Sequence, residues 1–279
     1  MRHRLGLYAL SATLLLAATS TTASAATPIF GATFDSSTTA NLAAGNATPV
    51  VGGAVTINSS SSKFGAGSLD ATGVTSGGNG LRYATAANFN PLAGTVDFWT
   101  QLPNGFNGTR QDLFSIFAGG YTGDFSLYID PGSQRLQTIV DVAGANQWTQ
   151  QGYANANTVL GDGNWHHVAW EWDTAAGFAT LYVDGAPENY SVIGSVSFVG
   201  GTLGAAMEIG SRQGGYDAFQ GNIDDFRLFD SAIYKQAGFT PPAQSTIVPE
   251  PSAALSLLIG GVLLRFNSRG EGRHSLARI

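Results

Sequence analysis

The most regular alternation of hydrophobic and polar positions runs from Asn164 to Gly185. Two segments rich in aromatic and aliphatic residues, Trp165–Asp173 and Phe178–Val183, are joined by four residues that end in Gly177. Two such segments with a short Gly-containing connection are typical of an antiparallel β-hairpin. Because side chains alternate between the faces of a strand, the first segment has an apolar face and a more polar face. These faces are Val168, Trp170 and Trp172, and His167, Ala169, Glu171 and Asp173. We expect this hairpin in the middle of a β-sheet.

Similar short runs recur along the body of the chain. Gly, Pro and Asn turn signals separate them, and no stretch of about 10–15 residues has a helical period. The expected strands are Ile29–Phe34, Val50–Ile57, Leu81–Ala84, Thr95–Gln101, Leu113–Ala118, Phe125–Ile129, Leu136–Val142, Met207–Gly210 and Ile223–Phe229. This spacing predicts an all-β sandwich rather than alternating strands and helices.

The composition agrees with many short strands and narrows the chemistry. The chain has 279 residues, 43% of them hydrophobic, so one domain can bury a substantial core. Its 37 glycines suit turns better than helices, since Gly costs about 1 kcal/mol relative to Ala inside a helix. Cysteine is absent, which excludes disulfides and thiolate chemistry. Residues 26–247 carry 7 Lys and Arg against 17 Asp and Glu without a basic cluster, which argues against a nucleic-acid partner.

The N-terminus has the three parts of a secretory signal peptide. Arg2 and Arg4 precede the apolar run Leu5–Ala18, and the small residues Ala23–Ala25 form a cleavage signal. The run is shorter than the about 20 residues that span a bilayer as a helix. We therefore expect residues 1–25 to be a signal peptide and the protein to be exported.

Four sequence segments follow one another along the body of the chain. They are Phe64–Leu69, Gly94–Trp99, the hairpin with its Trp-His-His-Val-Ala and Leu-Tyr-Val-Asp-Gly sequences, and Gly221–Tyr234. In this order they resemble the laminin G-like domains of the concanavalin A-like jelly-roll family. The resemblance implies an all-β, two-sheet antiparallel jelly-roll sandwich over residues 26–238.

The last part of the chain differs in composition. The polar, Pro-containing stretch 239–247 is expected to be a linker. The residues that follow are Val248, Pro249, Glu250 and Pro251, the apolar run Ala253–Leu264, and a basic end that begins at Arg265. An apolar segment followed by arginines inserts with those arginines on the cytoplasmic side. Residues 248–279 resemble a PEP-CTERM sorting tail, which implies a short hydrophobic helix, attachment to the membrane and processing by an exosortase-type membrane protease.

The sequence holds little catalytic machinery. His166 and His167 point to opposite faces of a strand, which does not favour a shared metal ion. Glycoside hydrolysis needs two carboxylates that face one cleft. The nearest approach to the Glu-x-Asp-x-x-Glu pattern of laminarinase-type jelly rolls is Glu171-Trp172-Asp173, and no Gly-x-Ser-x-Gly motif is present. We therefore expect a protein that is not an enzyme.

Calcium is the candidate metal, because Ca²⁺ takes oxygen ligands and the body is acidic. Laminin G-like relatives often hold a calcium ion at the rim of the sandwich. The resemblance implies a site where Asp35, after the first strand, meets Asp224 or Asp225 on the last strand. The alternative is that these carboxylates cap turns or pair with Arg227 or Arg212.

Three aromatic residues are candidates for ligand binding. Trp148, Tyr153 and Tyr216 fall in or beside Gly-, Asn- and Gln-rich segments that we expect to be loops. Sugars are commonly bound by an aromatic platform together with amide and carboxylate groups. The alternative is that Trp148 and Tyr153 are ordinary core or hairpin residues.

These observations favour an exported, non-catalytic binding module of the cell envelope, cell surface or extracellular matrix that recognises polysaccharide. Two alternatives stay open, since jelly rolls host several functions. A structural or adhesive matrix protein would expose an apolar patch for protein contacts. A glycan-active enzyme would hold two facing carboxylates.

Overall fold

The computed structural model describes residues 26–50, 54–74, 80–118, 124–142, 145–155, 160–188, 190–194, 196, 198, 202–212 and 216–247. The expected signal peptide and sorting tail, with its C-terminal helix, lie outside these residues. The described residues form β-strands and one short 3-10 helix, η1 (Leu160–Asp162). In this part of the chain, no helix has the length and apolar character needed to cross a bilayer.

The strands form two sheets whose neighbouring strands are antiparallel. Sheet A has the order β13-β12-β11-β6-β16-β1-β2, and β4 joins it beside β16 and carries β3. Its strands are β1 (Phe30–Ala32), β2 (Leu42–Ala43), β3 (Thr56–Asn58), β4 (Ser68–Asp70), β6 (Ala93–Gln101), β11 (Trp165–Asp173), β12 (Phe178–Val183), β13 (Ala186–Pro187) and β16 (Asn222–Phe229).

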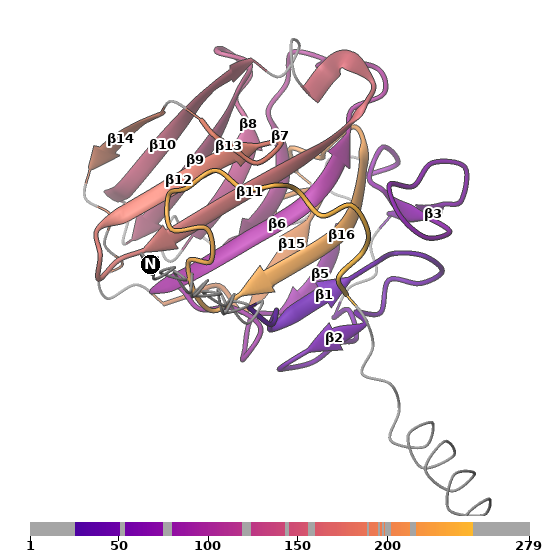
Figure 1. Cartoon of the computed structure of the whole chain (residues 1–279), viewed down its shortest axis with the longest axis horizontal. Coiled ribbons are helices and arrows are strands. Elements are labelled where there is room, and N and C mark those ends of the chain that lie inside the picture. The colour runs from indigo at the N-terminus through magenta and orange to yellow at the C-terminus, as the bar shows by residue number, and fades with distance from the viewer. Residues whose placement is uncertain are drawn as a thin grey trace, which may run out of the picture.

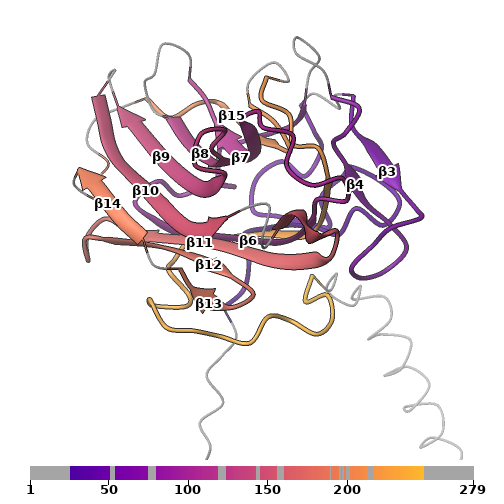
Figure 2. The ribbon, with the colours of Figure 1, turned by 90° about the horizontal axis from the view of Figure 1, so that it is seen from above.

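Sheet B has the order β14-β10-β9-β8-β7-β15-β5. Its strands are β5 (Leu81–Ala84), β7 (Gln111–Ile116), β8 (Asp124–Ile129), β9 (Arg135–Val142), β10 (Ala145–Asn155), β14 (Tyr190–Gly194) and β15 (Ala206–Ile209). Figure 1 shows sheet A in front of sheet B, and Figure 2 shows the two layers from above. The predicted all-β, two-sheet antiparallel sandwich is therefore confirmed.

The predicted central hairpin is confirmed as β11 and β12. Its register pairs Val168 with Val183, and the far side of β11 pairs with β6. Val168, Trp170 and Trp172 fill the core between the sheets and are at most 1% exposed. The ring of Trp172 lies so close to Gly94 on β6 that a Cβ atom there would be 2.5 Å from it. The apolar face of the hairpin is thus the core of the domain.

The second face of β11 is also buried, which the alternation does not predict. His167 and Glu171 are both 0% exposed. The C-terminal strap, residues 231–247, crosses this outer face of sheet A (Figure 2). The Glu171 carboxylate accepts hydrogen bonds from three consecutive backbone N–H groups of the strap, residues 234–236, at 2.6–3.1 Å, and from the Tyr182 hydroxyl. These hydrogen bonds offset the free-energy cost of removing the Glu171 carboxylate from water.

A buried ion pair lies beneath the strap. The Arg227 guanidinium on β16 donates two hydrogen bonds to the Asp97 carboxylate on β6, at 2.7 and 3.1 Å. Both side chains are at most 5% exposed. The Tyr234 hydroxyl also donates to Asp97, and Arg227 donates to Thr246. The pair therefore ties the middle of sheet A to the strap.

The strap remains on the sheet up to the last described residue, in contrast to the linker expected for residues 239–247. The rings of Phe239 and Tyr234 stack with centroids 3.6 Å apart. Ile247 is 5% exposed and lies so close to Gly31 on β1 that a Cβ atom at Gly31 would be 3.1 Å from it. Proline and polar residues exclude strand pairing here, but the segment packs through side chains instead.

Candidate functional site

The outer face of sheet B, which is turned away from the core, carries a row of polar side chains. In-register pairing places Arg82 of β5, Glu208 of β15, Ser115 of β7 and Ser126 of β8 side by side on four adjacent strands. The residues between them along each strand point into the core, since side chains alternate across a sheet. Register rather than sequence proximity therefore creates this row.

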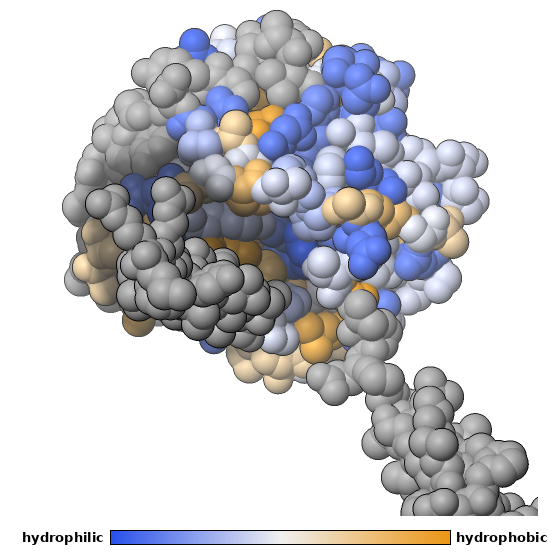
Figure 3. Space-filling model, viewed as in Figure 1, coloured by the Kyte–Doolittle hydropathy of each residue, from blue (hydrophilic) through white to orange (hydrophobic). Residues whose placement is uncertain are grey.

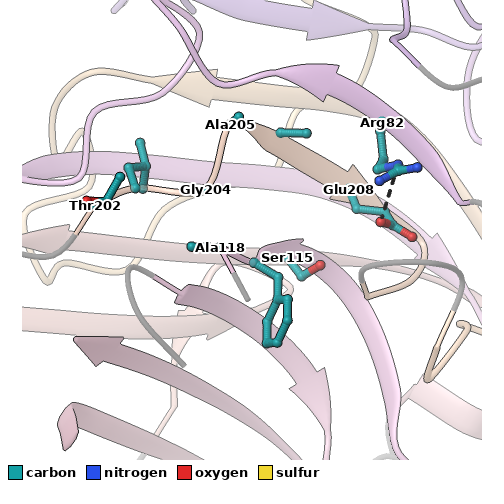
Figure 4. A pocket seen from close by; sticks show the side chains of 10 residues that line it. Arg82, Ser115, Ala118, Thr202, Gly204, Ala205 and Glu208 are labelled. Atoms are coloured by element: carbon teal, nitrogen blue, oxygen red, sulfur yellow. Dashed lines mark ion pairs between the residues drawn. The ribbon is translucent and has the colours of Figure 1, made fainter. Parts of the chain in front are cut away.

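A pocket of about 390 Å³ opens over one end of this row. It is lined by Arg82, Ser115, Phe117, Glu208 and the segment Thr202–Ala206. Figure 4 shows the side chains of Arg82 and Glu208 turned toward each other, with their charged groups 3.9 Å apart. The pocket therefore combines an ion pair, a hydroxyl group and an aromatic ring, which are the groups that bind a polar ligand.

A second pocket, of about 270 Å³, lies near the start of β7. Arg110, Tyr216 and Asp217 are among the residues that line it. The Arg110 guanidinium donates two hydrogen bonds to Asp112, at 2.8 and 2.9 Å, and lies 3.7 Å from the centre of the Tyr128 ring. The face of the Tyr128 ring is therefore covered, whereas Tyr216 is 52% exposed and open to a ligand.

Arg110 favours the charged form of the buried carboxylate of Asp112. Asp112 is 0% exposed, and burial raises the pKa of its carboxyl group although Arg110 acts in the opposite direction. Asp217 lies 2.9 Å from Arg212 and 3.6 Å from Arg110. The charged groups of this pocket thus form a chain in which acids and arginines alternate.

Comparison with known families identifies the domain. The sequence profile of the Concanavalin A-like lectin/glucanases superfamily matches residues 75–236, which is more than half of the chain. The chain belongs to this superfamily. A comparison with the sequences of curated proteins finds no match.

Solved structures share the concanavalin A-like fold at low sequence identity. Domain 4 of an extracellular arabinanase from Geobacillus stearothermophilus, solved in complex with arabinotriose, matches 75% of this chain and 94% of its own at 16% identity, with a TM-score of 0.53. The receptor-binding domain of botulinum neurotoxin C/D mosaic serotype matches 85% of this chain at 14% identity, with a TM-score of 0.52. The match covers 52% of that botulinum chain. These likenesses show the fold.

The concanavalin A-like domain does not bring the three candidate aromatic residues together. Trp148 and Tyr153 lie within the 11-residue strand β10 and not in loops, and the backbone of Trp148 pairs with Val140 and Gly194. The structure describes the backbone of Trp148 and Tyr153 but not their side chains. Tyr216 follows β15, which is four strands away from β10, or about 19 Å at the usual strand spacing. Tyr216 lines the pocket near the start of β7.

Each of the candidate calcium ligands accepts at least one hydrogen bond. One Asp35 oxygen accepts the N–H of Ala66 at 2.5 Å. Both Asp224 oxygens accept backbone N–H groups, of residues 63, 64 and 225, at 2.7–3.0 Å. Asp225 accepts the Ser245 hydroxyl. Among the described residues, no group of three or more His, Asp or Glu side chains could hold a metal ion. These hydrogen bonds anchor the 63–66 loop, and the calcium site stays a prediction.

The adjacent histidines occupy opposite environments. The two ring nitrogens of His166 lie 2.8 Å from Asp184 and 3.0 Å from Asp162. His167 is buried between the rings of Trp99 and Phe239, at 5.2 and 5.5 Å between centroids. The two rings thus have separate partners, in agreement with the alternation of side chains along β11.

Apart from Tyr216, sequence reasoning missed the residues that line the two pockets. Arg82 and Glu208 are far apart in the sequence, and only the pairing of β5 with β15 brings them together. One local signal was available, because Asp124, Ser126 and Tyr128 alternate with apolar residues along β8. Such alternation indicates a strand with one polar face.

Proposed function

We propose that this domain is an exported, non-catalytic carbohydrate-binding module that holds glycan on the outer face of sheet B. The observation that carries the proposal is the pocket at each end of β7, one of them beside the open ring of Tyr216. Sugars present hydroxyl groups to polar side chains and C–H faces to aromatic rings. The arabinotriose in the related arabinanase domain supports the same ligand class for this fold.

The absence of a free carboxylate pair in the described pockets supports binding over catalysis. A glycosidase needs one carboxylic acid and one free carboxylate about 5–10 Å apart across the sugar. Glu208 accepts the Ser211 hydroxyl and faces Arg82, and Asp112 is held by Arg110. Carboxylates that are paired with arginines in this way can accept hydrogen bonds from a ligand, but they are not free to act as a general acid or a nucleophile.

The surface supports carbohydrate binding over protein adhesion. Figure 3 shows hydrophobic and hydrophilic residues interspersed over the coloured part of one side of the molecule. The large hydrophobic side chains that are exposed among the described residues are Val50, Leu92 and Tyr216, on three separate segments. An adhesive face would gather such side chains into one patch.

The tail belongs to the same proposal. Residues 1–25 direct export, and the PEP-CTERM-like tail attaches the protein to the membrane until an exosortase-type protease processes it at the cell envelope. Ile247, which packs on β1, directly precedes the proposed tail. The intact mass of protein recovered from the producing cells tests this: loss of the chain beyond Pro251 supports processing, and a full-length C-terminus contradicts it.

Glycan binding is tested with a polysaccharide array and calorimetry. We expect Tyr216→Ala to weaken binding about tenfold, or about 1.4 kcal/mol, without a change in unfolding temperature. Leu92→Ala, which removes another exposed side chain away from the pockets, should bind as the wild type does. Each measurement is repeated with calcium and with a chelator. Absence of binding to every polysaccharide under both conditions would contradict the proposal.

A further inference from the structure

The cations of the domain are few, and their positions bear on the charge of the ligand. Residues 26–247 contain seven Lys and Arg side chains: Lys63, Arg82, Arg110, Arg135, Arg212, Arg227 and Lys235. Arg227 is buried on the sheet A side, Lys63 lies 3.7 Å from the centre of the Trp99 ring of sheet A, and Lys235 belongs to the strap. Only arginines therefore remain for sheet B and its loops.

Each arginine near the two pockets faces a carboxylate. Arg82 lies 3.9 Å from Glu208, and Arg110 makes two hydrogen bonds to Asp112. Arg212 lies 2.9 Å from Asp217, and Arg135, at the start of β9, is also engaged. The positive charges of Arg82, Arg110 and Arg212 are thus each paired with a carboxylate of the protein.

An anionic sugar that binds these arginines must either displace their acids or place a second anion beside them. Asp112 is 0% and Glu208 is 3% exposed. A carboxylate that loses its partner at such depth is strongly destabilised, because water cannot replace the lost interaction. The 17 acidic side chains of residues 26–247 against 7 basic ones also repel a polyanion at longer range.

We propose that the outer face of sheet B selects uncharged polysaccharide and rejects glycans that carry uronate, sialate or sulfate groups. This inference rests on the proposed carbohydrate-binding function and specifies its ligand class. Hydroxyl groups of a neutral sugar bind the paired Arg and Asp side chains without separating them, since each carboxylate has more than one acceptor site. Such binding depends little on salt, because no net charge is neutralised.

The test measures binding by the full chain to neutral polymers, such as arabinan, xylan and β-glucan, and to polygalacturonate and alginate. Measurements are made at about 0.01 M and about 1 M salt, where the screening length differs about tenfold. We expect binding to at least one neutral polymer at both salt concentrations, and binding to the uronate polymers at least about tenfold weaker. Uronate binding at low salt that disappears at high salt overturns the inference but leaves the carbohydrate-binding function standing. Absence of binding to every polymer overturns both.

Two variants with the same change in charge test whether the pairing of the arginines, rather than the net charge of the domain, excludes anionic glycans. Asp217→Asn frees Arg212 and weakens the hold on Arg110 at a side chain that is 27% exposed. It should gain salt-dependent affinity for polygalacturonate. Asp230→Asn makes the same change in charge on an exposed residue that follows β16 of sheet A, and it should gain none. Equal behaviour of the two variants would overturn the role of the paired arginines.

Discussion

The neighbouring residues His166 and His167 are expected to give stability opposite dependences on pH. His167 is buried against Trp99 and Phe239, and its ring nitrogens have no hydrogen-bond partner among the residues that the structure describes. Burial lowers its pKa from 6.5 to about 4, although the nearby Asp97 raises it in part. Burial also lowers the pKa of His166, but its hydrogen bonds to Asp184 and Asp162 outweigh this effect and raise the pKa above its ordinary value.

The sign for His167 follows from proton uptake. The unfolded chain protonates this ring near pH 6.5 and the folded chain near pH 4, so the unfolded state binds more protons between these values. Stability is therefore unaffected by His167 above pH 6.5 and falls as the pH decreases toward 4. The difference between the two pKa values corresponds to a loss of about 3 kcal/mol. His166 acts in the opposite direction: its contribution is present below its unfolded pKa and is lost as the pH rises through the folded one. Its partners are exposed, so this contribution is small.

Urea unfolding of the wild type, His167→Leu and His166→Asn between about pH 4 and pH 7 measures these contributions. His167→Leu should become more stable relative to the wild type as the pH falls, because the variant has no buried imidazole to protonate. His166→Asn should become less stable relative to the wild type over the same interval. The carboxylates are the same in all three proteins, so their pH-dependent contributions cancel when the free energies of unfolding are subtracted. The reasoning is refuted if the difference between His167→Leu and the wild type does not vary with pH.

Two further predictions concern the strap and the ion pair beneath it. Asp97→Asn removes the carboxylate that is hydrogen-bonded to the buried Arg227 guanidinium and leaves Asp225, 3.8 Å away, as the nearest anion. The variant should lower the free energy of unfolding by about 3–5 kcal/mol in urea titrations. A change below about 1 kcal/mol would contradict the stabilising role of the pair. A chain that ends at Ile247 should keep the unfolding temperature of the full chain. A chain that ends at Phe239 should melt several degrees lower, at about 2–4 °C per kcal/mol, because it lacks the contacts of Thr246 and Ile247, and equal melting temperatures would show that those contacts do not stabilise the fold.

The parts of the fold that follow from the sequence are those with a local signal. Leu81–Ala84 coincides with β5, and the hairpin of β11 and β12 has the predicted faces because aromatic and polar residues alternate along it. Strand β10 gives no such signal, since its Asn and Gln residues are common in loops. The burial of Glu171 was not predictable either, because the segment that covers it has no strand pattern.

The candidate site was harder to predict than the fold because tertiary pairing creates it. Tyr216 had a local signal, an aromatic residue in a Gly-rich segment, and it lies at a pocket. Arg82 and Glu208 become neighbours only through the register of β5 and β15. Asp35 and Asp224 do meet the same loop, as their proximity to the first and last strands suggested. Their backbone partners could not be inferred from residue type.

The position of β16 sets a condition on how the protein reaches its folded form. This strand, Asn222–Phe229, lies in the interior of sheet A between β6 and β1, although it comes late in the sequence. A nascent chain shorter than this point leaves apolar strand edges without partners, and contacts between distant segments form slowly. The interior of sheet A is therefore completed only after β16 has been synthesised, and until then the edges of β6 and β1 lack the strand that joins them.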